Sequence, residues 1–201
     1  MSTPFFRAAL ASFVSLLLLP AAQAGVVLNG TRLIYPAGEP EVTLKLDNRN
    51  PHPALLQVWM DDGQPQAAPE DVDVPFVITP PVFRLEPGRS QTIRVQHAGE
   101  ALPPDRESLF WLNALEVAPK PKDDGPTNYM QLAFRTRIKV FYRPATLPYS
   151  VEQARRRIST RLVRSSEGLA VEVDNPTPYH LSLASIGLKL ADRVLAQASG
   201  Q

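Results

Sequence analysis

The sequence predicts an all-β protein, and three observations carry this prediction. Apolar residues alternate with polar ones over short runs, which is the period of a half-buried β-strand. Pro, Gly, Asn and Asp separate these runs, and proline supplies 21 of the 201 residues, about twice its average share of ~5%. Some seven such strands within residues 25–144 are typical of an immunoglobulin-like sandwich.

Residues 1–24 are predicted to be a secretory signal peptide that takes no part in the fold. Arg7 supplies a positive start, residues 8–19 form an apolar segment too short to span a bilayer, and residues 22–24 read Ala-Gln-Ala, a small-residue cleavage site. We therefore expect cleavage before Gly25 and export of the remaining chain, which has no further segment apolar enough to be membrane-embedded.

The composition argues against several classes of function. Arg7 is the only charged residue of the signal peptide, so the exported part has 20 of the 21 basic residues against 20 acidic ones, a net charge of zero. This argues against nucleic acid as a partner. The chain has no cysteine, no glycine-rich phosphate loop and no metal-ligand spacing among His52, His97 and His180. We expect no enzyme, no metal and no cofactor.

The strands of the first domain are predicted in order from residue 26. They are residues 26–35, 41–46, 55–60, 76–79 with 82–85, 91–96, 108–117 and 128–143. In the strand at 108–117 we expect Leu109, Trp111 and Leu112 to be the apolar positions. Asp61 and Asp62 follow the third strand in a turn and are expected to be solvated.

The strand at residues 128–143 is the longest, and it has two different sides. One side carries Met130, Leu132, Phe134, Thr136, Ile138, Val140 and Tyr142. The other side is cationic at Arg135, Arg137 and Lys139, and Pro144 ends the strand because proline cannot donate to a ladder. Large apolar side chains on a long strand suit either its own core or the core of a partner, and the periodicity alone does not choose between them.

Residues 145–201 are predicted to hold a linker and an incomplete second domain. Residues 150–158 suit one or two helical turns capped by Ser150. Strands are expected at residues 160–164, 169–173, 179–184 and 186–190. Their apolar sides need a second sheet to cover them, so either this domain is built differently or the chain lacks its C-terminal part.

Several stretches of the chain carry long and specific motifs. Residues 104–113 read Pro-Asp-Arg-Glu-Ser-Leu-Phe-Trp-Leu-Asn, and residues 132–144 end in Arg-Ile-Lys-Val-Phe-Tyr-Arg-Pro. Together with residues 79–88 and the Asn-Pro-Thr-Pro-Tyr at residues 175–179, these stretches resemble the periplasmic pilus chaperones, the PapD-like family of the chaperone–usher pathway. The resemblance implies two immunoglobulin-like domains in a boomerang arrangement, here residues 25–144 and an incomplete domain at residues 145–201.

The resemblance also implies a function and site residues. Such a chaperone binds pilin subunits in the periplasm by donor-strand complementation and delivers them to an outer-membrane usher for fimbrium biogenesis. The family's donor positions fall on Met130, Leu132 and Phe134, and the pair that binds the subunit's C-terminal carboxylate falls on Arg32 and Lys139. The rival interpretation is an exported immunoglobulin-like adhesin or pilus structural module, which would bury the same apolar residues in its own core.

Glu107 and Arg143 match two members of a family ion-pair network that links the two domains. The third member is an aspartate for which this chain has no counterpart, so we expect the chain to be truncated at its C-terminus. The short loop at residues 120–127 resembles the branch of the family that assembles rod-like pili. Lys139 lies on the opposite side of its strand from Phe134, and the sequence does not explain how both would reach one ligand.

Overall fold

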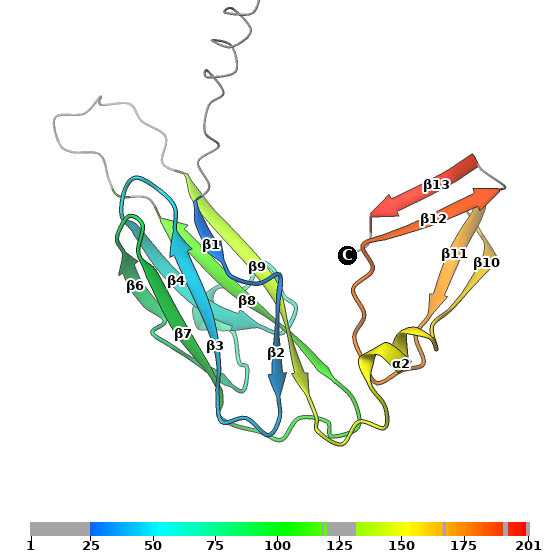
Figure 1. Cartoon of the computed structure of the whole chain (residues 1–201), viewed down its shortest axis with the longest axis horizontal. Coiled ribbons are helices and arrows are strands. Elements are labelled where there is room, and N and C mark those ends of the chain that lie inside the picture. Colours follow the sequence, from blue (N-terminus) through cyan, green and yellow to red (C-terminus); the bar gives the residue numbers. More distant parts are fainter. Residues whose placement is uncertain (1–24, 118, 120–131, 167, 191–192, 200–201) are drawn as a thin grey trace, which may run out of the picture.

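The computed structural model describes residues 25–117, 119, 132–166, 168–190 and 193–199. Figure 1 shows two lobes set at an angle: strands β1–β9 form the first, and α2 with β10–β13 forms the second. Strands dominate both lobes, which confirms the predicted all-β class. In the described part of the chain, no helix is long and apolar enough to cross a membrane.

The first lobe is a sandwich of two sheets. One sheet has the order β1 (Val26–Leu28), β3 (Val42–Asn48), β7 (Ser90–His97) and β5 (Phe76–Thr79). The other has the order β2 (Arg32–Pro36), β9 (Ala133–Arg143), β8 (Ser108–Val117), β4 (Ala54–Asp61) and β6 (Val82–Leu85). A short 3-10 helix, η1 (Pro69–Asp71), follows β4. The predicted immunoglobulin-like sandwich is therefore confirmed.

The prediction of one strand over residues 26–35 is wrong, because two strands in different sheets occupy this stretch. β1 pairs with β3 in the first sheet, whereas β2 runs parallel to β9 in the second. The chain crosses between the sheets around Gly30. This crossing has a functional consequence, since it brings the start of β2 to the long strand β9 and sets Arg32 opposite Lys139.

Alternate residues of each strand point between the two sheets and form the core. On β9 these are Ile138, Val140 and Tyr142, as predicted. On β8 the prediction is confirmed for Leu112 and wrong for Leu109 and Trp111, because Phe110, Leu112 and Ala114 are buried while Leu109 and Trp111 stay only half-buried. Both sides of that strand carry large apolar residues, so alternation in the sequence did not distinguish them. The other strands contribute residues such as Leu46, Leu56, Ile93 and Val95 to the same core.

The second lobe begins with the predicted helix and continues as two hairpins. α2 (Val151–Arg155) starts at Ser150 in a capping box with Gln153, which confirms the expected cap. β10 (Ser159–Ser165) pairs with β11 (Gly168–Asp174), and β12 (Ser185–Leu190) pairs with β13 (Arg193–Ser199). The four strands therefore form two separate two-stranded sheets within the described residues.

The strand predicted at residues 179–184 is wrong. Residues 180–184 lie outside the strands, and they follow a bend at residues 175–179 in which the Asn175 side-chain amide donates to the Tyr179 carbonyl at 2.9 Å and the Thr177 hydroxyl donates to Asn175 Oδ1 at 2.6 Å. Tyr179 is buried, and its hydroxyl donates to the backbone carbonyl of Tyr149. The segment thus packs against the linker between the two lobes instead of joining a sheet.

Candidate functional site

The first half of β9 has a strand neighbour on one side only. β8 pairs with β9 from Ala133 to Tyr142, whereas β2 covers the opposite edge only from Lys139 to Arg143. Within the described residues, the edge at residues 133–138 therefore has no partner strand. Such an edge presents unpaired N–H and C=O groups, which form a template for a strand from another chain.

Two large apolar side chains stand out from this half of the strand. Leu132 is 56% exposed and Phe134 is 61% exposed, although they lie on the same side of the strand as the buried Ile138 and Val140. The apolar stripe of β9 thus continues past the end of its own core. Met130, the third predicted donor residue, lies outside the described residues.

The predicted cation pair is adjacent in the sheet. Arg32 on β2 is the register partner of Lys139 on β9. Arg32 is exposed, and the Lys139 ammonium lies 5.3 Å from the centre of the Trp111 ring. Both alternate along their strands with buried core residues and so lie on the outer side of the sheet, in the register where the pairing of β9 with β2 begins.

A cavity of about 250 Å³ lies between the two lobes next to this pair. Its lining comes from β2, β9, α2 and the turn after Tyr179, and Lys139 is not part of it. The lining residues are Arg32, Ile34, Phe141, Arg143, Val151, Glu152, Arg155, His180, Leu181 and Ser182. Three arginines against one glutamate make the cavity attractive to an anionic group.

Glu107 connects the two lobes through direct contacts. Arg143 Nε donates to one of its carboxylate oxygens at 2.6 Å, and the backbone N–H of His180 donates to the other at 2.8 Å. The backbone N–H of Glu107 donates to the carbonyl of Pro178 at 2.8 Å. Glu107 is 2% exposed. The structure therefore brings the predicted pair Glu107–Arg143 together, and adds the main chain of the second lobe as its third component.

His180 packs on the sandwich at the edge of the cavity. Its ring stacks on Phe141 with the ring centres 5.9 Å apart. Burial lowers the pKa of His180 below its usual value; the charge of Glu107 opposes this shift and that of Lys139 adds to it. The imidazole is therefore neutral near pH 7 and leaves the positive charge of the cavity to the arginines.

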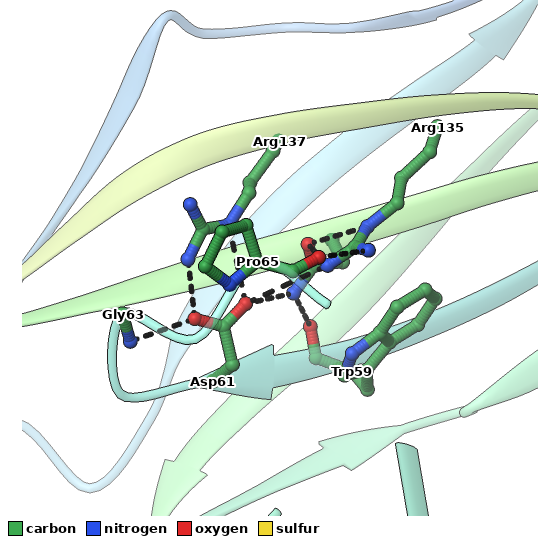
Figure 2. Close-up of polar contacts among 7 residues, drawn as sticks. Trp59, Asp61, Gly63, Pro65, Arg135 and Arg137 are labelled. Atoms are coloured by element: carbon green, nitrogen blue, oxygen red, sulfur yellow. Dashed lines mark hydrogen bonds and ion pairs between the residues drawn. The ribbon is translucent and has the colours of Figure 1, made fainter. Parts of the chain in front are cut away.

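Asp61 is buried, and the prediction that it is solvated is wrong. It is 0% exposed at the end of β4, and Arg137 donates to its carboxylate from β9 (Figure 2). Asn113 Nδ2 donates to Asp61 at 2.8 Å, and the backbone N–H of Gly63 donates at 2.7 Å. Arg135 lies next to this group and completes a network that joins β4, β8 and β9 (Figure 2).

The sequence contained a signal for this network that alternation alone did not reveal. Three cations follow one another on one side of β9, and the neighbouring strand β8 carries Trp111 and Asn113, which can contact guanidinium groups. The guanidinium of Arg135 lies 4.8 Å from the centre of the Trp59 ring, and that of Arg137 lies 4.1 Å from the centre of Trp111. Asp61 at the end of β4 supplies the counter-charge for these arginines, but its position in an Asp-Asp-Gly turn predicted a solvated carboxylate.

The charge of Asp61 should make stability depend on pH. Burial alone would raise the pKa of Asp61, but hydrogen bonds from Arg137, Asn113 and the Gly63 N–H outweigh burial and lower it. A carboxyl whose pKa is lower in the folded state stabilises the protein above its unfolded pKa of about 3.9 and loses this contribution as pH falls through the folded value.

We therefore expect the stability difference between the natural chain and Asp61→Asn to be largest at pH 7 and to shrink below about pH 4. Urea unfolding of both proteins between pH 7 and pH 2 measures this difference. A difference that stays constant over the whole range would show that the ionised form of Asp61 carries no stabilising role.

Comparison with known proteins identifies relatives that cover most of the chain. A family model described as "Pili and flagellar-assembly chaperone, PapD N-terminal domain" matches residues 25–148. The chaperone protein FimB/FhaD of Bordetella pertussis is 44% identical over 183 residues, which cover 89% of this chain and 74% of that protein.

Solved structures are similar in both lobes. The Pseudomonas aeruginosa CupB2 chaperone matches with a TM-score of 0.71 and 37% identity, and 87% of each chain is covered. A chain in the Salmonella enterica complex of the SafA pilin with the SafB chaperone matches with a TM-score of 0.66 and 28% identity, covering 89% of this chain and 82% of that one. These similarities confirm the class of two immunoglobulin-like domains. The family is one of chaperones and not a class of enzymes, and this chain belongs to it: it is a member of the PapD-like family of pilus-assembly chaperones.

Proposed function

We propose that the chain binds pilin subunits by adding a subunit strand to the free edge of β9 at residues 133–138. The single observation that carries this proposal is the pairing pattern of β9, which among the described residues has β8 on one side and an open edge on the other until Lys139. Main-chain hydrogen bonds along such an edge supply affinity, and alternate side chains enter pockets of the partner. A relative has been solved as a complex of the SafA pilin with the SafB chaperone.

Leu132 and Phe134 are the side chains that we assign to the subunit's groove, with Met130 as the third donor. Both described residues are more than half exposed in the unbound chain. Burying a large apolar side chain contributes roughly 1.5–3 kcal/mol, so several together outweigh any single polar contact. Their exposure favours a chaperone over an adhesin or a structural module, which would bury them in its own core.

Arg32 and Lys139 are assigned to the terminal carboxylate of the subunit. A strand that follows residues 133–138 lies on the same edge of β9 as β2 and must stop where β2 begins, beside Arg32 and Lys139. If it runs parallel to β9, the end that stops there is its C-terminus. A terminal carboxylate is a main-chain group in the plane of the sheet, so cations on one side of β9 can bind it while donor side chains point to the other side.

The wider role follows from the family. We propose that residues 1–24 are a cleaved signal peptide, that the exported protein works in the periplasm, and that it hands its subunit to an outer-membrane usher. We also propose a domain boundary near residue 144, and an action by binding alone, without catalysis or a cofactor. The part of the chain that the structure describes contains no group of three His, Asp or Glu side chains that would hold a metal ion.

Co-expression with a pilin subunit tests the proposal. The affinity-tagged chain, produced in a bacterial periplasm together with the pilin encoded beside it, should co-purify with that pilin as a one-to-one complex and protect it from proteolysis. The matched control is the same pilin without its last four residues, which removes the carboxylate from its proposed place beside Arg32. Equal recovery of the full-length and shortened pilin would contradict the carboxylate assignment, and no recovery of the full-length pilin would contradict the function.

A further inference from the structure

We propose that Asp61 is a positioning residue for pilin binding: together with Arg135 and Arg137 it holds the open half of β9 extended and ready before a subunit arrives. We call Asp61, Asn113, Arg135, Arg137 and the backbone carbonyl of Pro65 the donor-strand clamp (Figure 2). This inference rests on the proposed function, because the strand that the clamp holds is the proposed binding edge.

The open half of β9 needs such a clamp because little else holds it. The main chain of residues 133–138 pairs with β8 alone within the described part of the chain. The side chains of Leu132 and Phe134 are more than half exposed and are not part of the buried core. Segments with few buried contacts and exposed backbone hydrogen bonds open locally at low free-energy cost, so an unclamped strand end would fray.

The clamp contacts reach across β8 to β4, the next strand of the same sheet, and to the loop that follows β4. Arg135 donates from Nη2 and Nε to the side-chain oxygen of Asn113 at 2.7 and 3.0 Å, and from Nη1 to the carbonyl of Pro65 at 2.6 Å. Arg137 donates from Nη2 and Nε to the two carboxylate oxygens of Asp61. The open edge is thereby tied to β8, to β4 and to the loop after β4.

The surroundings make these contacts stronger than ordinary surface pairs. Asp61 is fully buried, and the side chains of Arg135 and Arg137 are 28% and 20% exposed. Each guanidinium lies over a tryptophan ring, Trp59 or Trp111. Exposed ion pairs contribute little because solvent screens them, whereas guanidinium groups stacked on aromatic rings and paired with a buried carboxylate are both shielded and restricted in orientation.

A purely structural role would have a different signature. It would lower only the stability of the whole sandwich, as Asp61→Asn is expected to do at pH 7, and hydrogen exchange would then accelerate in the core strands as much as at residues 133–137. A positioning role predicts an additional local effect in the variants. Only a fraction of their unbound molecules would keep the open half of β9 extended, and the apparent affinity for the subunit would fall in proportion to that fraction. The association rate should fall, because the bound strand gains the subunit as its second neighbour and the dissociation rate then depends little on the clamp.

The experiment compares Asp61→Asn, Arg135→Gln and Arg137→Lys with the natural chain. Amide hydrogen exchange is measured on the unbound full-length chains. The association and dissociation rates are measured on an immobilised pilin subunit, which is supplied as a complex with a more weakly binding chaperone that the tested chain displaces. Arg84→Gln is the matched control, because Arg84 on β6 forms an exposed pair with Glu86 at 2.7 Å on the same sheet.

We expect Asp61→Asn and Arg135→Gln to accelerate exchange of those amides within residues 133–137 that pair with β8 about tenfold more than exchange of the amides of β3 and β7, and to lower the association rate by a similar factor. Arg137→Lys keeps the charge but loses the two-pronged contact and should have an intermediate effect. Arg84→Gln should match the natural chain in both measurements. Unchanged exchange at residues 133–137 in a folded Arg135→Gln protein would overturn the proposal.

Two further outcomes separate this inference from the proposed function. If Asp61→Asn fails to fold, Arg135→Gln decides the question, because Arg135 is partly exposed and Asp61 keeps Arg137 as its partner. Faster exchange with an unchanged association rate would overturn positioning and leave pilin binding intact. Loss of binding by the natural chain itself would overturn the proposed function, while the exchange data would still report whether the clamp orders the strand.

Discussion

Replacing Arg32 by alanine is expected to weaken pilin binding by about 10- to 150-fold. This range corresponds to the ~1.5–3 kcal/mol that a hydrogen bond to a charged group contributes. Arg32 lies at the start of β2 beside Lys139 and lines the cavity between the lobes. Lys139→Ala should have a similar effect, and the double variant should lose less than the product of both, because the two cations share one carboxylate.

Titration calorimetry or a competition pull-down with one pilin measures these losses. Arg32 is exposed, so Arg32→Ala should unfold at the same temperature as the natural chain. Arg84→Ala removes an exposed arginine from the same sheet at a distance from the cavity and should bind normally. Wild-type affinity of both Arg32→Ala and Lys139→Ala would contradict the assignment of the carboxylate site.

Phe134→Glu is expected to abolish detectable binding. Phe134 is 61% exposed in the unbound chain, so glutamate costs little there, but in the complex the carboxylate would enter an apolar groove without a partner. The loss combines the missing apolar burial, roughly 1.5–3 kcal/mol, with the cost of desolvating a charge. Leu132→Glu should act in the same way.

Two matched variants separate the groove from a general effect of charge. Val77→Glu places the same charge on β5, where Val77 is 48% exposed on the other sheet, and should leave binding unchanged. Phe134→Leu keeps an apolar side chain and should weaken binding only modestly. Co-purification with the pilin reports all three. Normal recovery with Phe134→Glu would show that this side chain does not enter the subunit.

Local pattern predicted most of the fold because the core follows from alternation. The stripe that ends in Ile138, Val140 and Tyr142, the cap at Ser150 and the strands β10, β11 and β12 could all be read from neighbouring residues, whereas β13 was not predicted. Alternation failed where both sides of a strand are apolar, as on β8. It also failed at residues 179–184, which lie outside the strands after a bend with hydrogen bonds from Asn175 and Thr177.

Long-range placement explains what the sequence left open. Residues 26–35 have the pattern of one strand. They form two strands because residues 26–28 pair with β3 in one sheet and residues 32–36 pair with β9 in the other. This crossing between the sheets decides that Arg32 and Lys139 are neighbours. The burial of Asp61 likewise depends on Arg137, which is 76 residues away in the chain. No local signal specifies a contact at that separation.

The two sides of β9 therefore divide the work. In the proposed function, one side offers Leu132 and Phe134 to a partner, and the other side carries the cations that are proposed to fix the strand and, at Lys139, the proposed carboxylate site. The proposed strand addition accounts for the opposition of Phe134 and Lys139, which the sequence left unexplained, because the partner's last residue would lie in the plane of the sheet beside Arg32 and Lys139, which are register partners.

The most direct test of strand addition is amide hydrogen exchange of β9 with and without a bound pilin subunit. The account predicts that the subunit slows exchange at alternate residues within 133–138, whose N–H groups point to the open edge, and leaves residues 139–143, already paired with β2, unchanged. A stable complex in which the amides at residues 133–138 exchange as fast as in the unbound chain would contradict it.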